Sequence, residues 1–180
     1  MATYTLFTGS RYTFDTTYLA QFYGSQSATL FEVIGENGVL REANHGRNFT
    51  YRSNGFFNTG TVTERYTFTS DGRLSGQATG LNVDVATRNS LLSVGTSGYE
   101  YFQYELRGND TIRGSDEDDR FVGSHGRDRI DGRNGSDVLT FDGFDEGVLV
   151  NLATGRYRTS DGTSIVTASR MSKARISPIP

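Results

Sequence analysis

The chain has 180 residues, a formal net charge of −3 and no cysteine, which is enough for one domain or two small ones. The acidic balance argues against a nucleic-acid partner, and the lack of cysteine excludes a disulfide framework and thiolate chemistry. The 22 glycines, two prolines and 34% hydrophobic content are typical of a turn-dense, all-β chain.

Residues 1–7 lack the basic and apolar regions of a cleavable signal peptide. No apolar run approaches the roughly 20 residues that a membrane span needs. We therefore expect no cleaved leader and no membrane span. The composition does not indicate whether the protein is a monomer or an oligomer.

Residues 1–86 have the pattern of short strands separated by turns, and ten Tyr and twelve Phe supply apolar burial. Turn signals stand at 8–9, 36–38, 54–55 and 70–72, and the first hairpin turn is Glu36-Asn37-Gly38. The predicted strands are 2–7, 29–34, 39–42, 49–51, 61–63, 66–69 and 81–85. This spacing predicts an N-terminal module of β-solenoid or sandwich-like form.

Residues 87–106 admit a short helix. Thr87 is the predicted N-cap of a helix that Gly95 would end. Further on, Tyr99, Phe102 and Leu106 stand at helical spacing, although the aromatic content also suits a strand. A helix here would cover the open end of a coil of strands that follows it.

Between residues 105 and 140 one pattern recurs every ninth position. In each nine-residue block, an aspartate is followed two residues later by a large apolar side chain. Most blocks open with a glycine and have another glycine two residues before the aspartate. The aspartates are Asp110, Asp119, Asp128 and Asp137, and the apolar residues are Ile112, Phe121, Ile130 and Leu139. The opening glycines are Gly114, Gly123 and Gly132, and the residues two before the aspartates are Gly108, Glu117, Gly126 and Gly135.

One apolar residue between polar ones suits a very short strand with a single side chain turned inward. Glycine serves where the backbone needs positive φ or where a carbonyl must approach a ligand. Carboxylate and carbonyl oxygens, six or more at about 2.3–2.6 Å, form the shell that Ca²⁺ accepts. One loop cannot supply six, so two loops must stack.

If each block is half a coil, alternate blocks lie on the same edge. The predicted calcium sites then pair Asp110 with Asp128, and Asp119 with Asp137. The same arrangement places Arg113 and Asp131 side by side in one sheet, since they occupy the same position in blocks one and three.

The blocks resemble the nonapeptide repeat of the RTX (haemolysin-type) calcium-binding proteins of proteobacterial type, G-G-x-G-x-D-x-U-x with U a large apolar residue. Looser similarity to such proteins extends over residues 49–112 and 147–155. Glu105 and Leu106 replace the first two glycines of block one. In block two, Glu117 replaces a loop glycine, and either strains the loop or adds a ligand carboxylate.

The resemblance implies a short parallel β-roll that folds on binding Ca²⁺, in an extracellular protein exported by a type I system. The candidate metal-site residues are Asp110, Asp128, Asp119, Asp137, Gly108, Gly114, Asp116, Glu117, Gly123, Gly126, Gly132, Gly135 and Asp145. Asp145 enters with Asp142 and Glu146 as a third, weaker site above block three, with Asp128 below it.

The predicted organisation is an N-terminal β module at 1–104, the calcium-binding roll at 105–146, a β extension at 147–169 and a flexible tail at 170–180. Val148, Val150 and Leu152 alternate in the extension, and a turn follows at 153–155. The tail has no apolar periodicity and no clear type I export signature.

No catalytic constellation is recognisable. His45 and His125 are the only histidines, and neither a zinc-protease helix nor a Gly-x-Ser-x-Gly elbow is present. Together with what the RTX resemblance implies, this absence favours a secreted calcium-binding protein with a structural or adhesive role, for which extracellular polysaccharide is a candidate partner. The alternative is an extracellular polysaccharide-acting hydrolase, lyase or epimerase that uses the roll as a folding and export module.

Overall fold

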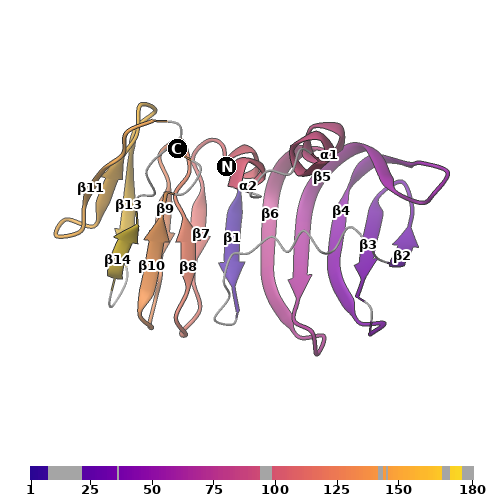
Figure 1. Cartoon of the computed structure of the whole chain (residues 1–180), viewed down its shortest axis with the longest axis horizontal. Helices are drawn as coiled ribbons and strands as arrows, with labels where there is room; N and C mark the ends of the chain where they lie inside the picture. Colours follow the sequence, from indigo (N-terminus) through magenta and orange to yellow (C-terminus); the bar gives the residue numbers. More distant parts are fainter. Residues whose placement is uncertain are drawn as a thin grey trace.

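The computed structural model describes residues 1–7, 22–35, 37–93, 99–141, 144, 146–167 and 171–175. Within them the chain forms fourteen strands and two short helices, which confirms the predicted all-β class. An eleven-stranded sheet has the order β11-β12-β13-β9-β7-β1-β6-β5-β4-β3-β2, and a second sheet has the order β14-β10-β8 (Figure 1). The predictions for the turn at 8–9, for Glu36 and for Gly95 concern positions outside the described residues.

The N-terminal module is an antiparallel meander, not the expected solenoid or sandwich. Its strands are β2 (Phe22–Gln26), β3 (Leu30–Ile34), β4 (Leu40–Tyr51), β5 (Phe57–Phe68) and β6 (Leu74–Asp84). The short strands predicted at 39–42 and 49–51 merge into β4, and those at 61–63 and 66–69 merge into β5. Gly80, at φ 71°, lies inside β6. The β5–β6 register shifts beside it, so this glycine makes a bulge and not a turn.

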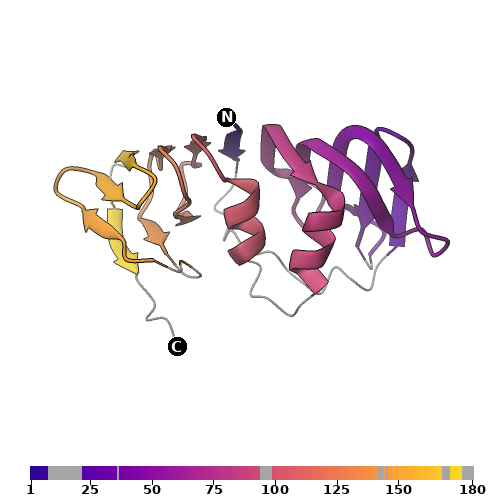
Figure 2. The same ribbon diagram turned by 90° about the horizontal axis from the view of Figure 1, so that it is seen from above.

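Helices α1 (Val85–Ser93) and α2 (Tyr99–Glu105) lie on one face of the meander (Figure 2). Asp84, and not the predicted Thr87, is the N-cap of α1, because the Thr87 amide donates to Asp84 Oδ1 at 2.8 Å. Strand β6 therefore runs directly into the helix. The helical prediction for Tyr99 to Leu106 is confirmed over α2. Neither described helix has the length and apolar character needed to cross a membrane.

Strand β1 (Thr3–Leu6) lies between the meander and the repeats. It is antiparallel to β6 and parallel to β7 (Thr111–Arg113), so one sheet runs across the predicted boundary at residue 104. The buried Arg65 guanidinium donates to Glu105 at 2.8 Å, to Tyr101 at 2.9 Å and also to Tyr4. Removing one partner from such a buried ion pair is strongly destabilising, so this group ties β1, β5 and α2 together.

The repeats form two parallel stacks of very short strands, β7 with β9 (Arg129–Asp131) and β8 (Arg120–Val122) with β10 (Asp137–Thr140). Arg113 pairs with Asp131, which confirms the half-coil arrangement. The apolar residues pile up in two columns, with Ile112 against Ile130 and Phe121 against Leu139. All four are at most 2% exposed. At the open end, Gln103 Nε2 of α2 donates to the Gly123 carbonyl at 2.7 Å, which supports the predicted covering role of this helix.

The segment after the repeats continues both sheets. Strands β11 (Leu149–Asn151) and β12 (Arg156–Arg158) are antiparallel, and β13 (Thr163–Thr167) lies between β12 and β9. Within the segment predicted as a flexible tail, residues 171–175 form β14 (Met171–Arg175), which pairs in parallel with β10. The edge of β10 offers backbone donors and acceptors that a strand satisfies without any apolar pattern.

Candidate metal centre

On the first edge, the loop ending at Asp110 stacks directly on the loop ending at Asp128. The Asp110 amide donates to Asp128 Oδ1 at 3.0 Å, and the Arg127 amide donates to Asn109 Oδ1 at 3.0 Å. These two bonds run in opposite directions and hold the loops in register. Gly126 has φ 109°, and a Cβ at this position would collide with the Gly108 carbonyl, so the loops approach this closely only with glycine here.

The second edge repeats the arrangement. The Asp119 amide donates to Asp137 Oδ1 at 3.1 Å, and the Ser136 amide donates to Asp118 Oδ1 at 2.7 Å. Gly135 has φ 108°, and a Cβ there would collide with the carbonyl oxygen of Glu117. The structure thus brings together both predicted aspartate pairs.

The block-opening glycines extend the strand ladders. Gly114, Gly123 and Gly132 donate their amides to the carbonyls of Asp131, Thr140 and Thr167, respectively. A Cβ at Gly114 would lie 2.7 Å from both Asp119 Oδ2 and the Gly132 carbonyl. Glycine at these positions lets adjacent half-coils pack against each other.

The acidic residues outside the repeat pattern lie differently. Asp116 is exposed, and its Oδ1 accepts from Asn134 at 3.0 Å. Glu117 is also exposed and is not among the described residues with positive φ, so its backbone lacks the strain that a left-handed loop position would cause. Asp142 and Asp145 lie outside the described residues. Glu146 Oε1 accepts from the Ser160 amide at 3.0 Å.

The four repeat aspartates are 0–3% exposed. Burial raises the pKa of Asp128 to about 6, that of Asp137 to about 6, and also that of Asp110. Buried carboxylates are costly unless an opposite charge compensates them. Asp110 Oδ2 is buried with no hydrogen-bond partner in the described part of the chain. The carboxylates thus provide the electrostatic environment of a cation site.

Several polar groups at these edges were not anticipated from the sequence. Ser115 and Ser124 occupy the same block position, and their hydroxyls donate to Asp119 Oδ2 at 3.1 Å and to Asp128 Oδ2 at 2.8 Å. Their shared phase in the repeat was a usable signal. Tyr157 also donates to Asp128 Oδ2, at 2.9 Å, but it comes from the β11–β12 hairpin, where the nine-residue period has ended.

On the first edge, Ser164 takes the next place after Asp110 and Asp128. Its Oγ accepts from the Asp128 amide at 2.9 Å, just as Asp128 Oδ1 accepts from the Asp110 amide. A serine at this rung adds no carboxylate, so the regular series of aspartates on this edge ends at Asp128.

In the part of the chain that the structure describes, no three His, Cys, Asp or Glu side chains gather closely enough to hold a metal by themselves. Each edge instead offers two carboxylates beside tightly stacked loops with carbonyl groups. A shell completed by carbonyl oxygens suits the hard ion Ca²⁺, whereas zinc sites use Cys, His and carboxylate side chains.

A family model of the RTX calcium-binding nonapeptide repeat matches residues 106–139 in four copies. Residues 106–139 are RTX calcium-binding repeats. The match confirms the resemblance of this segment to the RTX repeat, and RTX nonapeptide repeats bind Ca²⁺. Searches of curated proteins and of solved structures found no match.

The raised pKa values predict how the RTX array responds to pH without metal. The pKa of Asp128 rises from an ordinary 3.8 to about 6 on folding, so its contribution to stability is complete below about pH 4 and is lost as the pH rises through about 6. In EDTA, we therefore expect the melting temperature to fall between about pH 4 and pH 6 and to level off above about pH 7. Saturating Ca²⁺ should weaken or reverse this trend, because the metal needs the ionised form.

Thermal melts at several pH values in EDTA measure this effect. The double variant Asp128→Asn, Asp137→Asn is the control, because it removes both groups whose pKa is raised to about 6. Its pH dependence over this range should be flatter than that of the wild type. Identical pH profiles for the two proteins would contradict the prediction.

Proposed function

We propose that this chain is an extracellular protein whose RTX array folds as a β-roll on binding Ca²⁺ and thereby completes the sheet, in a structural or adhesive role. The observation that carries the proposal is the 2.6 Å hydrogen bond from the Ala2 amide to Asp110 Oδ1. Asp110 is at once a candidate calcium ligand and the anchor of the chain entering β1. A cation that fixes Asp110 therefore also fixes β1 between the meander and the repeats.

The proposed ligands on the first edge are Asp110 and Asp128, with carbonyls of the loops that contain Gly108 and Gly126. On the second edge they are Asp119 and Asp137, with carbonyls around Glu117 and Gly135. Two observations support these sets: the hydrogen bonds that hold each aspartate pair across 18 residues, and the burial of all four carboxylates.

Metal-dependent folding follows from the energetics of the array. Each strand β7 to β9 has three residues and buries one or two side chains, so a single rung has little stability of its own. Sites with a Kd of about 10⁻⁴–10⁻³ M would fill at extracellular calcium levels and stay empty in the cytosol. That difference suits type I export of a loosely folded array, followed by folding outside the cell.

Hydrogen exchange tests the proposal at the level of single strands. With Ca²⁺ the amides of β1, β7 and β9 should be protected, and in EDTA they should exchange much faster. The amides of β4 and β5 should change little, since these strands pair within the meander. Protection of β1 and β7 that is the same in both conditions would disprove the coupling.

Two nearby carboxylates in a cavity would favour the alternative of an enzyme that hydrolyses polysaccharide. The described residues that line the cavity between α1 and the β4–β5 turn include no Asp or Glu. This part of the lining therefore lacks the carboxylate pair that glycoside hydrolysis uses.

A further inference from the structure

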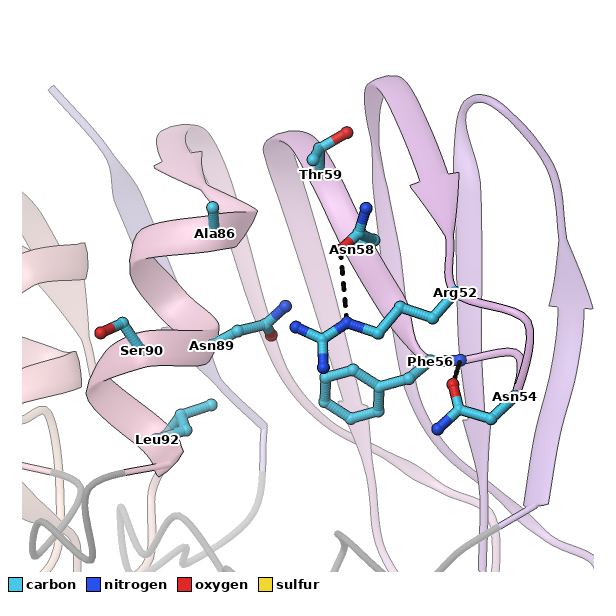
Figure 3. Close-up of a pocket in the computed structure, with 9 residues that line it drawn as sticks. All are labelled: Arg52, Asn54, Phe56, Asn58, Thr59, Ala86, Asn89, Ser90 and Leu92. Carbon is cyan, nitrogen blue, oxygen red and sulfur yellow. Dashed lines mark hydrogen bonds between the residues drawn. The ribbon is translucent and has the colours of Figure 1, made fainter.

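A cavity of about 540 Å³ opens between α1 and the turn that joins β4 to β5 (Figure 3). Its volume lies within the range of small-ligand sites. Its lining comes from residues 52–59 and 86–92, outside the calcium-binding repeats. The side chains that matter below are Arg52, Asn54, Phe56, Asn58, Asn89 and Leu92.

Among the described residues that line this cavity, Arg52 is the one with a charged side chain. Its guanidinium carbon lies 5.5 Å from the centre of the Phe56 ring, and Nε donates to Asn58 Oδ1 at 3.3 Å. Its terminal nitrogens point across the cavity toward α1 (Figure 3). Arg52 forms no ion pair with any described Asp or Glu. The guanidinium of Arg52 is therefore held in place, and its planar N–H groups can form two parallel hydrogen bonds to a carboxylate.

The turn that carries Arg52 is held by several contacts. The Gly55 amide donates to the Arg52 carbonyl at 2.8 Å, and the Phe56 amide donates to Asn54 Oδ1 at 3.1 Å. From β2, Gln26 Nε2 donates to the Gly55 carbonyl at 2.8 Å, and the Tyr23 ring packs edge-on to Phe56. A site built on a fixed turn loses less entropy when it binds a ligand.

The opposite wall belongs to α1. Asn89 Nδ2 donates to the Phe57 carbonyl at 2.7 Å, which fixes the amide, while its Oδ1 is buried without a hydrogen-bond partner in the described part of the chain. A buried acceptor without a partner is costly, so a ligand donor at this wall would be stabilising. Leu92 adds an apolar surface.

We propose that this cavity binds a carboxylated sugar, such as a uronate unit of an acidic polysaccharide. The Arg52 fork takes the carboxylate, the Asn amides meet ring hydroxyls, and Phe56 with Leu92 faces the apolar C–H groups. A lone inorganic anion would leave most of the volume and the second wall without contacts. A uronate would be the ligand class of the proposed adhesive role. The inference rests on that proposed function only for its biological setting.

Calorimetric titration of the full chain in saturating Ca²⁺ tests this inference, with an oligomer of galacturonic acid as the probe. The methyl ester of the same oligomer keeps the hydroxyls and removes the charge, and it should bind at least about tenfold more weakly. Arg52→Gln should lose a similar factor. Arg52→Lys should recover only part of the affinity, because an ammonium lacks the bidentate fork.

Arg73→Gln is the matched control, because Arg73 is an exposed arginine in the β5–β6 turn, paired with Asp71 and outside the cavity. It should bind the probe like the wild type. Equal binding of acid and ester, equal binding by wild type and Arg52→Gln, equally strong binding of inorganic phosphate, or no binding at millimolar probe would each overturn the proposal. The calcium-induced rise in melting temperature, measured on the same samples, shows that each variant is folded and reports separately on the proposed calcium function.

Discussion

Millimolar Ca²⁺ should raise the melting temperature of this protein by several degrees, EDTA should reverse the rise, and Asp128→Asn should remove much of it. Asp128 links three parts of the first edge, since its carboxylate accepts from the Asp110 amide, the Ser124 hydroxyl and the Tyr157 hydroxyl. Asparagine keeps a carbonyl oxygen for the Asp110 amide but removes the charge that a divalent ion needs.

The size of the effect follows from mass action. A site exposed to free calcium at ten times its Kd contributes about 1.4 kcal/mol to the free energy of unfolding. For a chain of this length, each kcal/mol corresponds to roughly 2–4 °C in melting temperature. One site is therefore worth about 3–6 °C, and Asp128→Asn should remove about that much.

Differential scanning calorimetry with Ca²⁺ and then EDTA measures both quantities. Asp71→Asn is the matched control, because Asp71 is an exposed aspartate in the β5–β6 turn, far along the chain from the repeats. Its calcium response should equal that of the wild type. If the melting temperature responds to neither calcium nor EDTA, calcium-coupled folding is disproved. If Asp128→Asn responds fully, the first edge is not a calcium site.

Gly126→Ala should produce the largest loss of stability among single substitutions in the repeats. The backbone at Gly126 has φ 109°, which L side chains rarely adopt, and the new Cβ would collide with the Gly108 carbonyl. The loops must then separate, which breaks the bonds between Asp110 and Asp128 and between Asn109 and Arg127. We expect a loss of about 3 kcal/mol or more, together with a weakened calcium response.

Two further glycines separate the effect of backbone strain from the effect of the Cβ collision. Gly108 also has positive φ, at 115°, but a Cβ there would meet nothing within 4 Å, so Gly108→Ala should cost only the backbone strain of about 1–3 kcal/mol. Gly147 has neither constraint, and Gly147→Ala should be close to neutral. Urea unfolding in saturating Ca²⁺ compares all three variants. A loss for Gly126→Ala no greater than that for Gly147→Ala would show that close stacking of the loops is not required.

The repeat segment was readable from the sequence because its interactions recur at a fixed separation. A nine-residue period with one apolar residue per block implies half-coils, and half-coils place Asp110 beside Asp128 and Arg113 beside Asp131. Ser115 and Ser124, whose hydroxyls donate to Asp119 and Asp128, also share one position in the repeat, although the predicted site did not include them. The helical spacing of Tyr99, Phe102 and Leu106 likewise predicted α2.

Lengths of the meander strands were harder to predict. The sequence predicted a strand only at 81–85, after Gly80, whereas in the structure β6 continues through Gly80, which forms a bulge. Whether a glycine ends a strand or bends it depends on the neighbouring strand, which offers or withholds hydrogen-bond partners on both sides of the bulge. That information is not local to the glycine.

By itself, the sequence determined the all-β class, the repeat, its calcium chemistry and the pairing of its loops, because each depends on contacts between residues at regular spacing. Only the tertiary structure decided that β1 closes the gap between β6 and β7, that Tyr157 bonds to Asp128, that β14 extends β10 and that a cavity forms beside Arg52. The Ala2 amide and the Asp110 carboxylate are 108 residues apart. Strand pairing over such separations uses backbone groups that every segment carries, so the choice of partner comes from the packing of the whole chain.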